Sequence, residues 1–164
     1  MAYCRVKTKH FKNVSQQHQA AFIAINSISE EGTADAIDKD EILFGKGDCL
    51  IRDTLLWMYT NLSPVNIMRM DTALQQLADG NTSPYADYNY WSKNIVTAVG
   101  HIPGMYMMHV IRRNGFMQDL VAQVHNPFYF FYLYNKAAKA DAQKPPQLSE
   151  KSIRFLKWMD DKYR

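Results

Sequence analysis

The chain has 164 residues, of which 47% are hydrophobic and 21% are charged, and its formal net charge is +3. This length is enough for one domain with its own core, and the composition is that of a globular protein, which excludes a disordered chain. The longest apolar run has seven residues (128–134), far short of the roughly 20 residues of a membrane-spanning helix. We therefore expect a single globular domain over 1–164, cytoplasmic and without membrane insertion.

The first segment, residues 1–13, combines an extended pattern with positive charge. Arg5, Lys7 and Lys9 alternate with smaller or apolar side chains, Lys12 follows them, and the segment holds no acid. Alternation with a period of two is typical of a strand, or of an extended arm, with one polar side. The sequence thus predicts a basic ridge at this end of the chain.

Helix start and stop signals are dense in the rest of the chain. Three Ser-Pro or Asn-Pro pairs place a capping side chain directly before a proline, at residues 63–64, 83–84 and 126–127. Glycines 32, 45, 80 and 100 each follow a periodic apolar stretch, as helix-ending glycines do. The predicted fold class is all-α, a compact bundle of about seven to nine helices. The predicted helices span about 15–30, 34–43, 49–62, 64–78, 84–99, 127–142 and 150–163.

Residues 105–125 admit two interpretations. The spacing of Met117, Leu120 and Val124 indicates helix, and Asn114-Gly115 would then separate two short helices. Asn-Gly between apolar runs is also a strong hairpin signal, and a hairpin would give the basic N-terminal segment a partner. We favour helices here and keep the hairpin as the alternative.

A run of seven large residues, 128–134, begins the predicted helix 127–142. Seven consecutive large side chains cover the whole circumference of a helix, so they cannot all lie on one buried face. We expect a central helix that is packed on at least two sides, with its tyrosine hydroxyls bonded to neighbouring groups.

No sequence pattern identifies a catalytic or metal site. A metal-binding helix would show His-Glu-x-x-His or two histidines four residues apart, and neither occurs. The two cysteines have no metal-ligand spacing, and clusters of acids lie in polar stretches that are typical of solvated faces. We therefore expect no catalytic residue, no metal and no cofactor, and structural or surface roles for the histidines His10, His18, His101, His109 and His125.

The candidate binding residues lie near the two ends. In the predicted helix 150–163, Trp158 has Arg154 and Lys162 one turn away on either side, with Lys151 in line. A tryptophan between cations can anchor an acidic protein surface or stack on a nucleobase. Tyr90 is the tyrosine of helix 84–99 that we expect to be exposed.

Charge is unevenly distributed along the chain. Residues 136–164 carry eight cations and four acids, whereas residues 14–135 carry seven cations and twelve acids. Together with the basic residues 1–13, this gives two basic ends around an acidic middle.

Three functions are compatible with these patterns. We favour a non-catalytic protein-binding module, such as an inhibitor, immunity, adaptor or regulatory protein, because the sequence offers binding residues but no catalytic pattern. A nucleic-acid-binding protein could use the two basic ends, although the acidic middle would repel a duplex. The third is an enzyme or small-molecule binder with an unrecognised site beside the aromatic helix, involving His101, His109 or His125.

Overall fold

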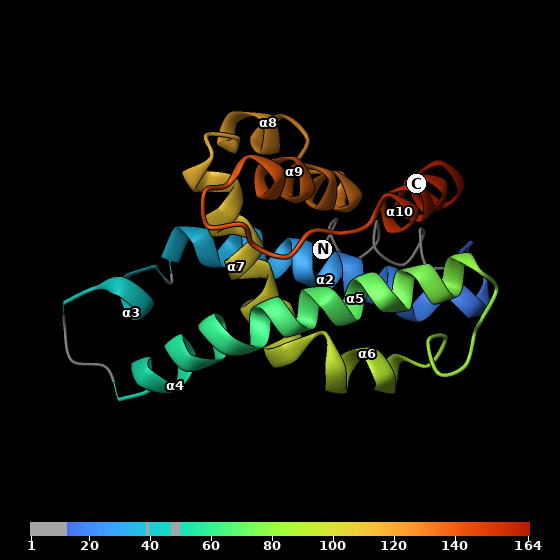
Figure 1. Ribbon diagram of the computed structural model, residues 1–164, viewed down its shortest axis with the longest axis horizontal. Helices are drawn as coiled ribbons and strands as arrows, with labels where there is room; N and C mark the ends of the chain where they lie inside the picture. Colours follow the sequence, from blue (N-terminus) through green and yellow to red (C-terminus); the bar gives the residue numbers. More distant parts are fainter. Residues whose placement is uncertain (1–12, 39, 47–49) are drawn as a thin grey trace, which may run out of the picture.

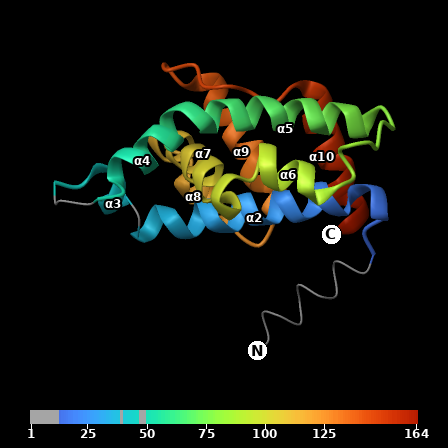
Figure 2. The same ribbon diagram turned by 90° about the horizontal axis from the view of Figure 1, so that it is seen from below.

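The computed structural model describes residues 13–38, 40–46 and 50–164. The described chain is all-α, as predicted, and within these ranges it contains no strand. Helices α2 (Gln16–Asp38) and α5 (Ser63–Ala78) run lengthwise, and α7 (His101–Arg113) crosses between them (Figures 1 and 2). Across these ranges, no helix combines the length and apolar character that a membrane crossing requires. The basic ridge predicted for 1–13, with Arg5, Lys7, Lys9 and Lys12, lies outside the described residues.

Helices α2 and α7 touch through their backbones. A Cβ atom added to Gly32 of α2 would lie 2.5 Å from the carbonyl carbon and oxygen of Gly104 in α7. A Cβ added to Gly104 would lie 2.4 Å from the backbone oxygen of Ile28. Because no side chain larger than hydrogen fits at either position, these glycines set how closely the two helices approach.

The prediction that Gly32 ends a helix is wrong. Helix α2 continues through Gly32 to Asp38, and α3 (Asp40–Phe44) follows it as a separate short helix. A glycine inside a helix costs about 1 kcal/mol relative to alanine, so it is an unfavourable choice on local grounds. Its contact with α7 explains its place in α2, since packing between helices overrides local helix propensity.

Helices α4 (Arg52–Trp57) and α5 are joined by a π-helical turn, η1 (Met58–Leu62). The sequence predicted that Ser63 would cap a new helix, but Ser63 has helical backbone angles (φ −59°, ψ −47°). Its N–H bonds to the oxygen of Met58, five residues back, and its hydroxyl donates to the backbone oxygen of Ile102 at 3.1 Å. The wider turn lets the helix continue into Pro64, which has no N–H to donate.

The segment between α5 and α8 also differs in part from the prediction. Helix α6 (Tyr88–Asn94) is capped by Asp87, whose carboxylate accepts from the N–H of Asn89 at 2.8 Å, and not by the predicted Ser83. A 3-10 turn, η2 (Thr97–Gly100), leads into α7. The favoured interpretation of 105–125 is confirmed: α7 and α8 (Met117–Ala122) are helical, so the hairpin alternative is wrong.

The aromatic run forms most of α9 (Pro127–Ala140), whose cap is the predicted Asn126. Phe128 and Phe130 lie on different sides of this helix and are both fully buried. The predicted packing on more than one side is therefore confirmed. The hydroxyl of Tyr132 donates to the carboxylate of Asp160 at 3.3 Å, and that of Tyr134 donates to a backbone oxygen in the loop before α10.

Helix α10 (Glu150–Tyr163) has the predicted bounds and the predicted cap, Ser149. It connects to α2 through His18, which is only 4% exposed. The Nδ1 atom of His18 lies 2.8 Å from the hydroxyl of Tyr163 and 2.8 Å from that of Ser15. Burial of this ring, and to a smaller extent the charge of Lys162, lower the pKa of His18 below its ordinary value.

Replacing Gly32 by alanine should destabilise the fold. Helix propensity alone predicts a gain of about 1 kcal/mol. The clash with Gly104 should instead lower the free energy of unfolding by roughly 1–3 kcal/mol, as overpacking does. Urea denaturation measures this change.

The matched control for this substitution is Gly80→Ala, because Gly80 has a φ of +83° but nothing within 4 Å of an added Cβ. It should cost only about 1 kcal/mol, from the left-handed backbone. A Gly32→Ala protein at least as stable as the wild type would show that α2 and α7 do not touch here.

Acid should destabilise the protein through His18. Because the folded state lowers the pKa of His18, the unfolded chain binds a proton that the folded chain resists. The free energy of unfolding should fall as the pH drops through about 6.5, the ordinary pKa of histidine. Urea denaturation between pH 5 and 8 should show this slope reduced in His18→Gln. Equal slopes in wild type and His18→Gln would contradict the assignment.

Candidate metal centre

Three side chains that can bind a metal meet where α2 contacts the start of α7. Glu31 and Asp35 are four residues apart on α2, so they lie on one side of that helix, and His101 is the first residue of α7. The Nδ1 atom of His101 is 2.7 Å from Oδ2 of Asp35 and 3.3 Å from Oε2 of Glu31. One potential ligand atom from each residue lies within 4.8 Å of the other two.

A left-handed turn in η2 places His101 against these acids. Ala98 and Val99 both have positive φ values, 51° and 59°, and Gly100 follows with a φ of 105°. A Cβ on Gly100 would lie 2.9 Å from the backbone carbon of Ser27 in α2. Left-handed backbone costs a residue with a side chain roughly 1–2 kcal/mol. This turn therefore persists only because the structure on both sides holds it.

Helix α5 anchors both sides of the turn. Before it, the buried side chain of Asn66 donates to the hydroxyl of Thr97 at 2.7 Å. After it, the buried hydroxyl of Ser63 donates to the backbone oxygen of Ile102 at 3.1 Å. These two bonds fix Thr97, directly before the strained turn, and Ile102, directly after His101, and thereby the position of His101.

Burial differs sharply among the three residues. The side chain of Asp35 is 1% exposed, whereas those of Glu31 and His101 are 33% and 31% exposed. A buried carboxylate is costly unless it is hydrogen-bonded or paired, and the imidazole of His101 supplies such a partner. The group thus has a closed side at Asp35 and an open side at Glu31 and His101, from which a ligand can enter.

The donor set fits a divalent cation. One imidazole nitrogen and two carboxylates are ligands that Zn²⁺ accepts, and three protein ligands leave a position open for water or substrate. Around a tetrahedral zinc, neighbouring ligand atoms are roughly 3.3–3.6 Å apart. The separation between His101 and Glu31 agrees with this value, and the hydrogen bond between His101 and Asp35 would lengthen by under an ångström. With two oxygens and one nitrogen, the set also suits Mn²⁺ or Mg²⁺.

Those predicted binding residues that the structure describes lie elsewhere. On α10, Lys151 pairs with Asp79, and Arg154 is 3.7 Å from Glu150. Trp158 is 41% exposed and stacks on Phe155 at 5.5 Å between ring centroids, and Lys162 lies 4.5 Å from its ring, as the spacing suggested. Tyr90 lies on α6, half-buried against the ring of Tyr85 at 5.1 Å. None of these residues belongs to the three-residue group.

Sequence reasoning missed the group for an identifiable reason. With the first predicted helix ending near residue 30 and the next spanning about 34–43, Glu31 and Asp35 do not share a helix, and their spacing of four residues carries no signal. One signal was present: Ala21, Ile28 and Asp35 are spaced by sevens, which puts an acid on the buried stripe of a single long helix. His101 could not be paired with that acid from sequence, because 66 positions separate them.

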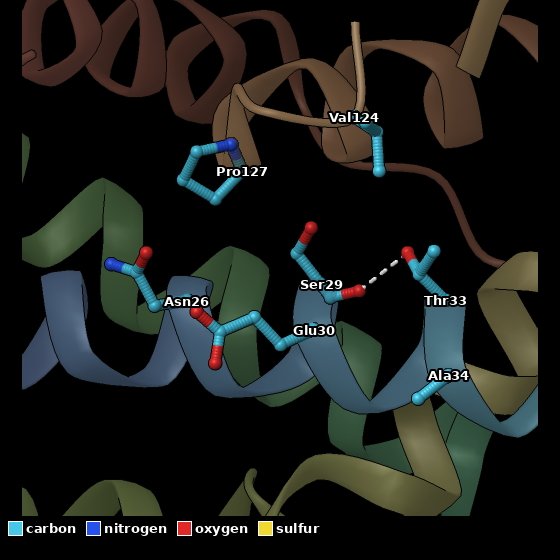
Figure 3. Close-up of a pocket in the computed structure, with 7 residues that line it drawn as sticks. All are labelled: Asn26, Ser29, Glu30, Thr33, Ala34, Val124 and Pro127. Atoms are coloured by element: carbon cyan, nitrogen blue, oxygen red, sulfur yellow. Dashed lines mark hydrogen bonds between the residues drawn. The ribbon is translucent and has the colours of Figure 1, made fainter. Parts of the chain in front are cut away.

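A separate hollow of about 250 Å³ lies on another side of α2. Figure 3 shows Asn26, Glu30 and Thr33 along α2, facing Val124 and Pro127 of the segment that leads into α9. The hydroxyl of Thr33 donates to the backbone oxygen of Ser29 at 2.7 Å. Its lining includes a single carboxylate and neither histidine nor cysteine, so it does not offer a metal-ligand set. It also lacks the three histidines that the sequence suggested for a pocket beside α9.

Comparison with known proteins identifies a family. The family model described as "Putative zinc dependent peptidase (DUF5700)" matches residues 3–143, which is most of the chain, and the chain belongs to this family. No curated protein and no solved structure matches it.

This family overturns the favoured function. The expectation of a non-catalytic protein-binding module, acting as an inhibitor, immunity, adaptor or regulatory protein, is contradicted, because the description of the matching family is that of a zinc-dependent peptidase. The alternative of an enzyme with an unrecognised site agrees better with the family and with the group of Glu31, Asp35 and His101.

The strain in η2 can be tested at Val99. Asparagine adopts positive φ values far more readily than a β-branched residue, and Val99 is 65% exposed, so little packing is lost. Val99→Asn should raise the free energy of unfolding by about 1 kcal/mol. The control is Val121→Asn on α8, where the native residue is 67% exposed in a helix. If Val99→Asn were no more stable than the wild type, the turn would not be strained in solution.

Proposed function

We propose that the protein is a metal-dependent peptidase whose metal is held by Glu31, Asp35 and His101. Two independent observations support this. The family's description is that of a zinc-dependent peptidase, and the fold brings one imidazole and two carboxylates within 4.8 Å of one another. The second observation carries the proposal, because it identifies side chains of this chain that could bind the metal.

Glu31, Asp35 and His101 differ in role because they differ in burial. Asp35 is closed off from solvent, and its Oδ2 lies 2.7 Å from Nδ1 of His101, so a metal bound by both atoms would replace the hydrogen bond between them. Glu31 and His101 line the open side, where a peptide would approach. When bound, a zinc ion polarises a carbonyl oxygen and lowers the pKa of bound water to about 7.

The chain differs from many zinc peptidases in its sequence pattern. It has no His-Glu-x-x-His segment, which in those enzymes supplies two histidine ligands and a general base. We therefore assign the metal to carboxylates and a single histidine, so that Mn²⁺ and Mg²⁺ compete with Zn²⁺ for this set more effectively than at a site rich in histidine.

Metal binding tests the proposal directly. Calorimetric titration of the chelator-treated chain with Zn²⁺, Mn²⁺ and Mg²⁺ should show one site per chain for at least one ion. Glu31→Gln keeps the size of the side chain but removes its charge, so it should weaken that site by tenfold or more. Asp35→Asn should weaken it similarly, and circular dichroism should verify that this variant, altered at a buried position, remains folded.

Glu30→Gln is the matched control, because Glu30 is the neighbouring residue on α2 and lines the hollow of Figure 3 instead. It should bind metal as the wild type does. Peptide cleavage that appears with the bound ion and disappears with chelator would establish the activity. Unchanged metal binding in both Glu31→Gln and Asp35→Asn would refute the assignment of the site.

A further inference from the structure

The hollow of about 250 Å³ beside α2 has one polar side and one apolar side. The polar side consists of side chains of α2 whose spacing of three and four residues puts them on one face of that helix: Asn26, Ser29, Glu30 and Thr33. Val124 and Pro127 lie across from them (Figure 3). Pockets for drug-sized ligands occupy roughly 300–1,000 Å³, so this smaller hollow suits a single side chain or a small molecule.

Ser29 directs an unbonded hydroxyl into the hollow. The residue is only 7% exposed, and within the described chain its hydroxyl has no hydrogen-bond partner. Figure 3 shows this hydroxyl pointing away from α2, toward the segment of Val124 and Pro127. A nearly buried polar group needs a hydrogen bond, and here only a molecule that enters the hollow can supply it.

The other polar groups of the hollow mainly accept hydrogen bonds. The side-chain nitrogen of Asn26 donates to the backbone oxygen of Phe22 at 2.8 Å, and the hydroxyl of Thr33 donates to that of Ser29 at 2.7 Å. The amide oxygen of Asn26 and the lone pairs of the Thr33 hydroxyl remain as acceptors, and the carboxylate of Glu30 only accepts. The described residues that line the hollow include no cation. The hollow therefore offers acceptors and one negative charge.

The start of α9 is the one feature here that would favour an anion, because the N-terminus of a helix carries positive partial charge. Its N–H groups are already used, however. Pro127 has none, that of Phe128 donates to the side chain of Asn126 at 3.0 Å, and that of Tyr129 donates to the backbone oxygen of Asn126 at 3.1 Å. No N–H of this first turn is left for an anion, and the charge of Glu30 would repel one.

We propose that the hollow binds a primary ammonium group on a short aliphatic stem, as in a lysine side chain or a small alkylamine. An ammonium is a compact charge with three N–H donors, which match the acceptors of Ser29, Glu30 and Thr33. The methylene groups of the stem would contact Val124 and Pro127. This site is distinct from the candidate metal centre, and the proposal depends neither on the metal nor on peptide cleavage.

Titration of the isotope-labelled full chain, followed by NMR, tests the proposal with n-butylamine and its uncharged counterpart 1-butanol. At pH 7 the amine is protonated, because the pKa of such amines is about 10.4. It should shift the amide signals of residues 26–34 and 124–128, with a Kd about tenfold lower than that of 1-butanol, since a charge-assisted hydrogen bond is the stronger one. Equal binding of the two ligands, or shifts confined to residues outside the hollow, would overturn the site.

Two substitutions locate the contacts. Ser29→Ala should weaken binding of the amine about threefold and should fold well, because alanine is the better helix former. Glu30→Gln should weaken it about tenfold and abolish the preference over 1-butanol. The matched controls are Ser27→Ala, on α2 but outside the hollow, and Glu150→Gln on α10, and both should bind as the wild type does. A preference for the amine that survives in Glu30→Gln would refute the assignment.

Two further ligands distinguish the sources of the ammonium group. N-acetyl-lysine N-methylamide presents it as a peptide does, and the norleucine analogue has the same aliphatic stem without the charge. If the lysine compound binds and the norleucine compound does not, the hollow takes a lysine side chain from a peptide or protein. If n-butylamine alone binds, the hollow takes a small amine. Either result supports the ammonium site, whereas failure of every amine to bind contradicts it.

Discussion

A backbone contact between two glycines holds α2 and α7 closer together than side chains would allow. Because Gly32 lies directly after Glu31, and Gly104 lies three residues after His101, the contact also sets the separation between the acids and the imidazole. Any wider spacing of the helices would pull His101 away from Asp35 and cost this buried carboxylate a hydrogen bond. The close approach of the two helices therefore also maintains the geometry of the candidate metal centre.

The strained turn of η2 makes this close contact between α2 and α7 possible. A helix that enters so close to α2 needs an abrupt start, and three successive residues with positive φ provide it. Helix α5 compensates through bonds from Asn66 and Ser63 on either side of the turn. Strain at functional sites is commonly stabilised by the surrounding structure in this way. The site thus depends on three elements that are distant in sequence, although its possible ligands come from two of them.

Sequence periodicity was sufficient for the fold class, for the bounds of α10 and for the central role of α9, because these follow from local caps and apolar patterns. It failed where tertiary packing opposed a local preference. Because a glycine inside a helix is locally unfavourable, the sequence predicts a helix end at Gly32, and this wrong prediction separates Glu31 from Asp35. The pairing with His101 depends on how α7 crosses α2, which no local pattern encodes. The π-helical turn before Pro64 was likewise not predictable from the sequence, since a Ser-Pro pair usually marks the start of a helix.

Asp35 occupies a position that a leucine would suit better. It continues the buried stripe of Ala21 and Ile28, and well-packed apolar residues at such positions are often as stable as a buried ionic pair or more so. Under the proposed function, an acid at this position would exchange folding stability for metal binding, a trade-off common at active sites. Selection for stability alone would remove it. If Asp35 holds a metal as proposed, a relative that has lost its metal should drift toward an apolar residue at this position.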